Sequence, residues 1–304
     1  MADVVQVPFA EGEARLDWLG LVAALEAGHR LPEAEIEDSF LYRGGDTVLS
    51  RAAWIDGLGI AVKTATVFPD NPRAGRPVIS GSVSLFEDHN GALEAVIDFH
   101  LVTKWKTAAD SLLAALRLTP EGAEQVLIVG AGAVARSIVE AFSAGFPNAR
   151  FDVWSRSGAR AGALADDFDH VRAVADLSAA CGRAQIIVGC TMATEPVILG
   201  DWLTPGTHVN LIGAYRPDMR EADDDALRRA TLYVDSRATT LGHIGELKIP
   251  LEAGVIMPDD IVSDFYALGL FERTAPDEIT IFKNGGGAHL DLMTSRYILE
   301  RWHA

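Results

Sequence analysis

The chain has 304 residues, of which 49% are hydrophobic and 23% charged, and its formal net charge is -17. This length suits two domains with separate cores, and the composition is typical of a globular protein. The dispersed acidic charge excludes general nucleic-acid binding, which requires basic patches. No apolar run reaches the ~18 residues of a membrane span, and no signal peptide is apparent, so we expect a cytoplasmic protein without a membrane partner.

The cysteines and histidines show no metal-binding or disulfide pattern. Cys181 and Cys190 stand outside any C-x-x-C spacing, and the eight histidines form no H-x-H or H-x-x-x-H pair. We therefore expect no metal, no disulfide framework and two buried apolar cysteines. His100 and His208 are interpreted as structural. His289, which follows a glycine run, is the histidine to test for function.

The first third of the chain predicts a helix followed by a mostly antiparallel sheet. The apolar spacing over 12–30 is helical, and residues 33–38 are acidic and expected to be exposed. Asn90-Gly91 is a strong hairpin signal between the last two predicted strands. The strands are expected over 46–55, 59–68, 78–87 and 92–101.

The remainder alternates between strand and helix patterns, which predicts a parallel, doubly wound sheet. A helix over 107–118 precedes Thr119–Gly122, the best candidate for a linker. The pattern loosens after Arg237. Strands are expected at 126–129, 150–154, 171–174, 185–189, 207–211, 231–234 and 280–282, and helices at 134–144, 159–168, 176–182, 222–229 and 290–301.

The fold class is therefore α/β, a Rossmann-type sheet joined to a mostly antiparallel α/β domain. A final helix often packs back on the first domain, so we expect a discontinuous division. Residues 1–118 and 283–304 form the expected substrate-binding and dimerisation domain. Residues 119–282 form the expected dinucleotide-binding domain.

The stretch Val126–Ala135 reads VLIVGAGAVA and carries the strongest functional signal. A buried strand precedes Gly130, which allows a tight turn, and Gly132, which allows backbone to approach a pyrophosphate. The N–H groups of the following helix would point at that anion, which adds Ala133 and Val134 to the candidates. An ordinary strand–turn–helix without ligand is the alternative, but the second strand that follows favours a nucleotide.

The residues after that second strand select the cofactor. An acid there would bind the ribose 2′-hydroxyl of NAD, whereas this chain has Ser155, Arg156, Ser157 and Arg160. A hydroxyl followed by arginines suits a 2′-phosphate, so NADP is favoured slightly over NAD. Asp152 comes too early and should point from mid-strand. The alternative is that Arg156 only solvates a turn.

Three lysines occupy positions that suggest an anion. Lys63 lies in an apolar strand, either at an edge with its head in water or in a pocket against an anion. Lys104 and Lys106 are expected just before a helix N-terminus, where cations are unfavourable unless an anion bridges them to the helix. Together these placements favour a carboxylate site.

The chain resembles the ornithine cyclodeaminase/mu-crystallin family in segments that span most of its length and keep their order. The segments are Ala61–Asn71, Thr103–Ala109, Val129–Ala133, Ile212–Glu221 and Tyr233–Ser236. The resemblance implies a homodimer formed through the N-terminal domain, a Rossmann domain, a nicotinamide cofactor and a small α-imino or α-amino acid substrate.

By position, Lys63 is similar to the family lysine that binds the substrate carboxylate. Lys106 replaces an arginine of the usual Thr-x-x-Arg-Thr-Ala-Ala motif. Arg43 and Arg51 are both candidates for the family's upstream substrate arginine, and the spacing fits neither cleanly. Tyr215 stands where the cyclodeaminases have a catalytic aspartate, and a phenol of reference pKa ≈ 10 cannot replace that base without a large shift.

The segment around Tyr215 is closer to the mu-crystallin branch, which implies an NAD(P)H-dependent imine reductase. Cyclic ketimines such as pyrroline- or piperideine-2-carboxylate and the open-chain iminosuccinate are candidate substrates. The two alternatives are an ornithine cyclodeaminase and a non-enzymatic, cofactor-dependent binder. Further cofactor-binding candidates are Thr107, Thr191, Met192 and Gly213.

Overall fold

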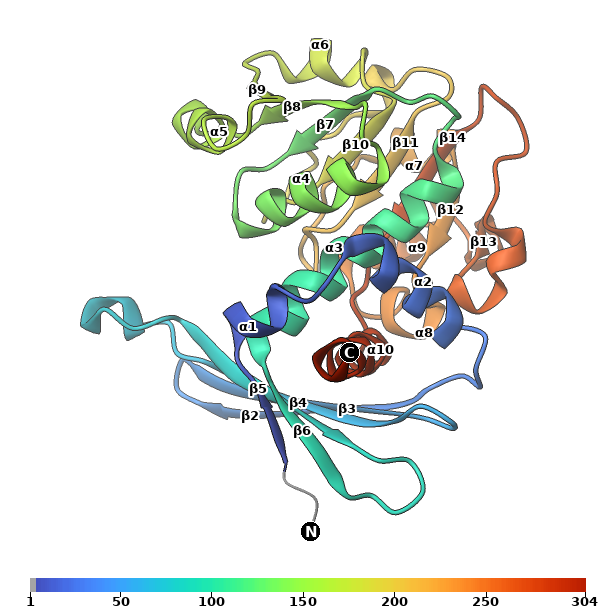
Figure 1. Cartoon of the computed structure of the whole chain (residues 1–304). Helices are drawn as coiled ribbons and strands as arrows, with labels where there is room; N and C mark the ends of the chain where they lie inside the picture. The colour runs from blue at the N-terminus through green and yellow to red at the C-terminus, as the bar shows by residue number, and fades with distance from the viewer. Residues whose placement is uncertain (1–3) are drawn as a thin grey trace. The chain divides into compact units, whose positions relative to one another are not determined.

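The computed structural model describes residues 4–304 and divides the chain into two compact units (Figure 1). The first unit comprises Met1–Lys106 and Gly286–Ala304, and the second Thr107–Gly285. The expected division lies after residue 118 and before residue 283. The first boundary of the compact units is earlier, within helix α3 (Phe99–Leu118), and the second is later, after Gly285.

The first unit has a six-stranded sheet in the order β1-β6-β5-β4-β3-β2. Only the β1–β6 pair is parallel, and the four other pairs are antiparallel. The prediction of a mostly antiparallel sheet is confirmed. The elements are β1 (Val5–Val7), α1 (Phe9–Glu13), α2 (Trp18–Gly28), β2 (Glu35–Arg43), β3 (Asp46–Ile55), β4 (Gly59–Val67), the 3₁₀ helix η1 (Asn71–Ala74), β5 (Ile79–Phe86), β6 (Leu93–Asp98) and α10 (Ala288–His303).

One prediction for the start of the chain is wrong, and a second is confirmed but incomplete. The single helix expected over 12–30 is two helices, because the Asp17 side chain accepts a hydrogen bond from Gly20 N at 2.6 Å and starts α2. The acidic segment 33–38 is largely exposed, but it enters β2. This strand lies at the sheet edge and buries no face, so its sequence lacks the alternation of a half-buried strand.

Helix α3 begins eight residues before its predicted start. Asp98 Oδ1 accepts hydrogen bonds from the backbone N–H groups of His100 (2.8 Å) and Leu101 (2.9 Å), which starts the helix at Phe99. Lys104 and Lys106 therefore lie inside the helix. They do not oppose the dipole at a helix N-terminus, so this prediction was wrong.

Helix α10 covers one face of the six-stranded sheet and contacts β3, β4 and β5 (Figure 1). Along β4 the alternate residues Gly59, Ala61, Lys63 and Ala65 are buried. Lys63 thus occupies a position where the pattern would place an apolar side chain. A cation can remain there only with an anionic or polar partner.

The second unit is a parallel eight-stranded sheet in the order β13-β12-β14-β11-β10-β7-β8-β9, as the strand–helix alternation predicted. The chain proceeds from β7 to β8 and β9 on one side, and β10 returns on the other side of β7. Its strands are β7 (Gln125–Val129), β8 (Arg150–Trp154), β9 (Val171–Ala173), β10 (Ile186–Gly189), β11 (His208–Leu211), β12 (Ala230–Val234), β13 (Ile261–Ser263) and β14 (Ile279–Lys283).

The helices of this unit follow the predicted alternation with small shifts at their ends. The loosened pattern after Arg237 corresponds to short elements, namely α8, α9, β13, η3 and η4. Among the described residues, no helix is long and apolar enough to cross a bilayer. The helices are α4 (Ala133–Gly145), α5 (Gly158–Ala165), α6 (Leu177–Cys181), η2 (Gly200–Trp202), α7 (Asp224–Arg229), α8 (Arg237–Thr240), α9 (Gly245–Glu252), η3 (Pro258–Asp260) and η4 (Phe265–Leu270).

Candidate functional site

The turn between β7 and α4 has the geometry of a nucleotide cradle. Gly130 has φ +132°, and a Cβ there would lie 2.7 Å from the carbonyl oxygen of Cys190. At Gly132, which precedes α4, a Cβ would meet nothing within 4 Å. Packing within the chain therefore does not require glycine at 132, whereas close approach of a ligand to the backbone does.

A cavity of about 410 Å³ adjoins this turn. It includes the predicted residues Gly132 and Ala133, and Arg160 from α5 adds a cation. The carboxyl ends of β7 and β10 lie at the point where the strand order reverses, and doubly wound sheets bind nucleotides at this point. The lining comprises Ala131, Gly132, Ala133, Arg136, Arg160, Ala163, Leu164 and Asp167.

The end of β8 offers a hydroxyl and arginines rather than a carboxylate. Asp152 points from mid-strand and pairs with Arg172 at 2.7 Å and Arg183 at 3.2 Å, as its early position predicted. The Ser155 hydroxyl donates to the carbonyl of Ser157 at 2.6 Å. Arg156 and Ser157 are exposed, and so is Arg160. A hydroxyl and exposed arginines suit a 2′-phosphate, so the preference for NADP over NAD stays a prediction.

A buried glutamate that the sequence analysis missed positions two predicted cofactor residues. Glu221 Oε1 accepts from Thr191 N (2.6 Å) and from the Thr191 hydroxyl (2.9 Å), while Oε2 accepts from Gly213 N (2.6 Å). Gly213 has no room for a Cβ, which would lie 1.9 Å from the Thr191 carbonyl oxygen. Glu221 thereby ties together the loops that follow β10 and β11.

A second buried glutamate and a lysine support this carboxylate. Glu246 Oε2 accepts from Glu221 N at 2.7 Å, and its Oε1 accepts from Ala222 N at 3.0 Å. Burial, with the charge of Glu221, raises the pKa of Glu246 to about 7. Lys283 Nζ donates to the carbonyl of Leu211 at 2.9 Å and supplies the neighbouring positive charge.

We expect Glu221→Gln to weaken nucleotide binding on the order of tenfold, about 1.4 kcal/mol. All three groups that Glu221 faces are donors, so an amide must direct its NH₂ toward one of them and lose that hydrogen bond. Fluorescence titration with NADH and NADPH measures the effect. Glu252→Gln, an exposed change at the end of α9, is the control. Unchanged affinity in Glu221→Gln would contradict the positioning role.

The other predicted residues of the second unit differ in exposure. Thr107 lies in α3, where its carbonyl accepts from the Asn284 side chain at 3.2 Å. Val134 is 37% exposed in the first turn of α4. Met192 and Tyr215 are 69% and 58% exposed, respectively. The Arg216 guanidinium carbon lies 5.7 Å from the centroid of the Tyr215 ring.

The first unit gathers cations around one buried carboxylate. Asp291 of α10, which the sequence analysis missed, accepts at Oδ1 from Lys63 Nζ at 2.9 Å and pairs with Lys106 Nζ at 2.8 Å. Lys63 also donates to the Thr103 hydroxyl at 2.7 Å, and Lys106 donates to the carbonyl of Gly286 at 2.9 Å. The structure thus places the ammonium groups of Lys63 and Lys106 beside the same carboxylate oxygen, Asp291 Oδ1.

Of the two candidate arginines, Arg51 joins this cluster and Arg43 does not. Arg51 is directly opposite Lys63 in the β3–β4 ladder, and its Nη1 lies 4.0 Å from Asp291 Oδ2. Asp38 of β2 pairs with Arg51 at 2.7 Å. Arg43 is exposed at the end of β2 and pairs with Asp46 at 3.1 Å. We call Lys63, Lys106, Arg51, Asp38 and Asp291 the cation cluster.

Lys104 also lies outside the cation cluster. Its ammonium donates to Glu13 Oε1 at 2.7 Å, on the side of α3 that packs near α1. Lys104 was expected to contribute to the carboxylate site with Lys63 and Lys106, but Glu13 of the same unit already neutralises its charge.

Burial sets the charge balance within the cluster. It lowers the pKa of Lys106 to about 7, against the attraction of Asp291. Burial alone would raise the pKa of Asp291, but Lys106, Lys63 and Arg51 lower it to about 2. Asp291 is therefore ionised throughout the neutral range, while Lys106 loses its charge just above neutrality.

We expect kcat/KM for a carboxylate substrate to fall with unit slope above about pH 7. Below its pKa Lys106 is an ammonium that attracts the carboxylate, and above it the amine is neutral. Lys106→Arg should hold kcat/KM nearly constant to higher pH, because guanidinium stays charged. Parallel pH profiles of both proteins make the measurement, and identical alkaline limbs would contradict this assignment.

Three histidines, His29, His208 and His289, are buried, whereas His100 is exposed in the first turn of α3. His289 has its ring centroid 5.3 Å from that of His29, edge to face, and burial lowers its pKa well below 6.5. His208 bonds Thr280 and Asn210, each at 2.8 Å, and burial lowers its pKa to about 3. The structural interpretation of His208 is confirmed. Among the described residues, no group of histidines, cysteines and acids could hold a metal.

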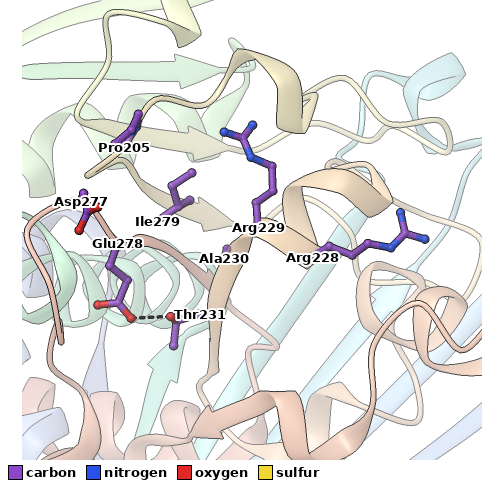
Figure 2. Close-up of a pocket in the computed structure, with 8 residues that line it drawn as sticks. All are labelled: Pro205, Arg228, Arg229, Ala230, Thr231, Asp277, Glu278 and Ile279. Carbon is purple, nitrogen blue, oxygen red and sulfur yellow. Dashed lines mark hydrogen bonds between the residues drawn. The ribbon is translucent and has the colours of Figure 1, made fainter.

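A cavity of about 460 Å³ lies elsewhere in the second unit (Figure 2). Its lining includes Ala230 and Ile279, the first residues of β12 and β14, so it sits at the amino edge of the sheet. Figure 2 shows Glu278 bonded to Thr231 and the side chains of Arg228 and Arg229 extending apart. Nucleotides bind at the opposite, carboxyl edge, so this cavity is not the candidate site.

Comparison with known proteins follows this geometry. The model of the ornithine cyclodeaminase/mu-crystallin family matches residues 53–304. The chain belongs to this family. It is 49% identical over 298 residues to a Delta(1)-pyrroline-2-carboxylate reductase of Paracoccus denitrificans, covering 95% of this chain and 94% of that protein. The predicted resemblance is thus confirmed.

One further relative and one solved structure extend the comparison. The ketimine reductase mu-crystallin of Mus musculus is 34% identical over 245 residues, covering 80% of this chain and 76% of that protein. The structure of a Thermococcus litoralis Delta(1)-pyrroline-2-carboxylate reductase with NADH and L-proline has a TM-score of 0.89 at 24% identity, covering 98% and 97% of the two chains. The α/β fold with a Rossmann-type sheet is confirmed.

Proposed function

We propose that this family member is an NAD(P)H-dependent reductase of small α-imino acids, which it converts to L-amino acids. The observation that carries the proposal is the cation cluster, in which the ammonium groups of Lys63 and Lys106 both pair with the buried Asp291 Oδ1. The glycine turn supports a dinucleotide in the second unit. The 49% identity to a pyrroline-2-carboxylate reductase supports the same reaction class.

The charge of the cluster favours a monocarboxylate. Its three cations face two carboxylates, Asp291 and Asp38, which leaves one positive charge when Lys106 is protonated. One substrate carboxylate balances that charge, and a second would have to be buried without a cation. We therefore infer a cyclic ketimine such as pyrroline-2-carboxylate as the preferred substrate over the dicarboxylate iminosuccinate.

The residues perform binding and orientation rather than covalent chemistry. Lys63 and Lys106 hold the carboxylate, and Arg51 adds positive potential beside it. A reduced nicotinamide supplies the hydride, which forms a new C–H bond at the imine carbon while the C=N π pair moves to nitrogen. The fixed charges need no reorganisation during this step, so positioning and electrostatics provide the rate enhancement.

The substrate panel that tests the function contains pyrroline-2-carboxylate, piperideine-2-carboxylate and iminosuccinate, each with NADH and with NADPH. We expect nicotinamide absorbance to fall with the two cyclic ketimines and more slowly with iminosuccinate. The exposed arginines after β8 predict a modest preference for NADPH. Confirmed nucleotide binding without turnover of any of these imines would exclude the reductase and leave the non-enzymatic binder.

Ornithine cyclodeaminase activity is the second candidate, and Tyr215 stands where the resemblance implies that this activity uses an aspartate. Formation of proline and ammonia from ornithine with catalytic NAD⁺ and no added reductant would support it. The exposed position of Tyr215 predicts that no such product forms.

We also propose a homodimer formed through β2. This edge strand exposes Leu41 and Tyr42 by 71% and 73%, and Phe40 by 49%. A long, exposed apolar edge is a pairing surface. We expect a particle of twice the 32.6 kDa chain mass in light scattering, and a monomer for Leu41→Glu. Leu19→Glu is the control, because the Leu19 side chain of α2 is 49% exposed and lies outside β2, and this variant should remain dimeric. A Leu41→Glu variant that remains dimeric would contradict the proposal.

A further inference from the structure

The two oxygens of Asp291 have different surroundings. Oδ1 serves both lysines, at 2.9 and 2.8 Å. Oδ2 is buried and makes no hydrogen bond to any residue within 4–304, and Arg51 Nη1 stands 4.0 Å away. A buried carboxylate oxygen without a donor is unfavourable, so this atom is available to a donor that arrives from outside the chain.

The proposed substrate carries such a donor in the required place. In an α-imino acid the carboxylate and the C=N carbon are directly bonded, so the imine nitrogen is close to one carboxylate oxygen. When Lys63 and Lys106 hold the carboxylate, the nitrogen is therefore brought beside the carboxylate that those lysines share. A protonated imine presents an N–H group with positive charge, which complements an anionic acceptor.

We propose that Asp291 Oδ2 accepts a hydrogen bond from the N–H of the protonated imine, which makes Asp291 a catalytic residue; the inference rests on the proposed function. Asp291 stabilises the iminium, the form that accepts hydride most readily. The hydride forms the C–H bond, the C=N π pair becomes the nitrogen lone pair, and the N–H proton stays on nitrogen. Asp291 neither gains nor loses a proton.

This assignment provides the carboxylate that the segment around Tyr215 lacks. The cyclodeaminase-type aspartate is replaced there by a phenol that is 58% exposed. Asp291 comes from α10 instead, is 1% exposed and is ionised at neutral pH. A purely structural counter-ion for the lysines would use Oδ1 alone and would not distinguish substrates by their N–H group.

Two planar analogues test the role without turnover. Pyrrole-2-carboxylate has a ring N–H beside its carboxylate, and furan-2-carboxylate has a ring oxygen at the same position. With saturating NAD⁺ or NADP⁺, we expect calorimetry to show that the wild-type protein binds the pyrrole about tenfold more tightly or better. Asp291→Asn should keep its amide oxygen on the lysines and turn its NH₂ outward, which removes or reverses the preference.

Thr103→Val is the matched variant, because it removes a hydrogen bond from Lys63 without touching Asp291. It should weaken both analogues by the same factor. Equal binding of the two analogues by the wild type overturns the role of Asp291, even where Asp291→Asn does not fold. An enzyme that reduces pyrroline-2-carboxylate but shows no analogue preference refutes this inference alone, whereas a protein inactive toward every imine refutes the proposed function as well.

Discussion

Lys63→Met is expected to lower kcat/KM for pyrroline-2-carboxylate on the order of 100-fold or more, about 3 kcal/mol. The variant removes one of the two ammonium groups that share Asp291 Oδ1. Asp291 keeps Lys106 as its partner, so the carboxylate is not left alone and the fold should persist. The loss should appear mainly in KM, since the carboxylate is held both before and during hydride transfer, so rates should differ most at substrate concentrations well below KM.

Lys104→Met is the matched control for this variant. Lys104 is of the same residue type and lies in α3 near Lys106, but it pairs with Glu13 outside the cation cluster. Its removal should leave kcat/KM within about twofold, because this partly buried ion pair lies outside the cation cluster. Thermal unfolding of both variants separates loss of binding from loss of folding. Equal losses of kcat/KM in the two variants would contradict the assignment of Lys63.

Gly132→Val is expected to raise the dissociation constants for NADH and NADPH on the order of 100-fold, about 3 kcal/mol. A Cβ at this position meets nothing in the chain within 4 Å, so the protein should fold normally. The added side chain would occupy the space into which the backbone N–H groups at the start of α4 must admit a pyrophosphate. Fluorescence titration of the reduced nucleotides measures the change.

Gly162→Ala provides the control for the nucleotide site. Gly162 lies within α5, where a Cβ also meets nothing within 4 Å, and it is not among the residues that line the cavity at the glycine turn. The change should leave nucleotide affinity unaltered and stabilise the helix by about 1 kcal/mol. Nucleotide binding by Gly132→Val at wild-type strength would show that the β7–α4 turn is not the cradle.

The sequence predicted the parts of the fold that depend on local patterns. Alternating strands and helices identified the parallel sheet, and Asn90-Gly91 marked the β5–β6 hairpin. Local patterns failed at β2, an exposed edge strand without alternation, and at the start of α3. The first residue of α3 is set by one side chain, Asp98, which accepts two hydrogen bonds from backbone N–H groups.

The candidate site was predicted less completely because its members meet only in the folded chain. Lys63 was identified by its position in an apolar strand, and Lys106 by family resemblance. Asp291 gave no comparable signal, since an acid in the first turn of a helix is common and favourable. Only the packing of α10 on β4 places its carboxylate between the two lysines.

Glu221 and Glu246 were missed for a related reason. Their partners are backbone N–H groups of loops that are distant in the sequence, and hydrogen bonds to backbone leave no residue pattern. The need for donors arises from the full burial of both acids, which only the fold reveals. The roles assigned to the individual site residues remain predictions.

The most direct measurement follows one hydrogen atom. Reduced nicotinamide cofactor carrying deuterium on the transferred face of C4 is incubated with pyrroline-2-carboxylate, and the product is analysed by mass spectrometry. The account predicts L-proline with one deuterium at Cα, formed, at substrate concentrations well below KM, at a rate that Lys63→Met lowers on the order of 100-fold. Tight binding of the cofactor with no deuterium in proline would contradict it.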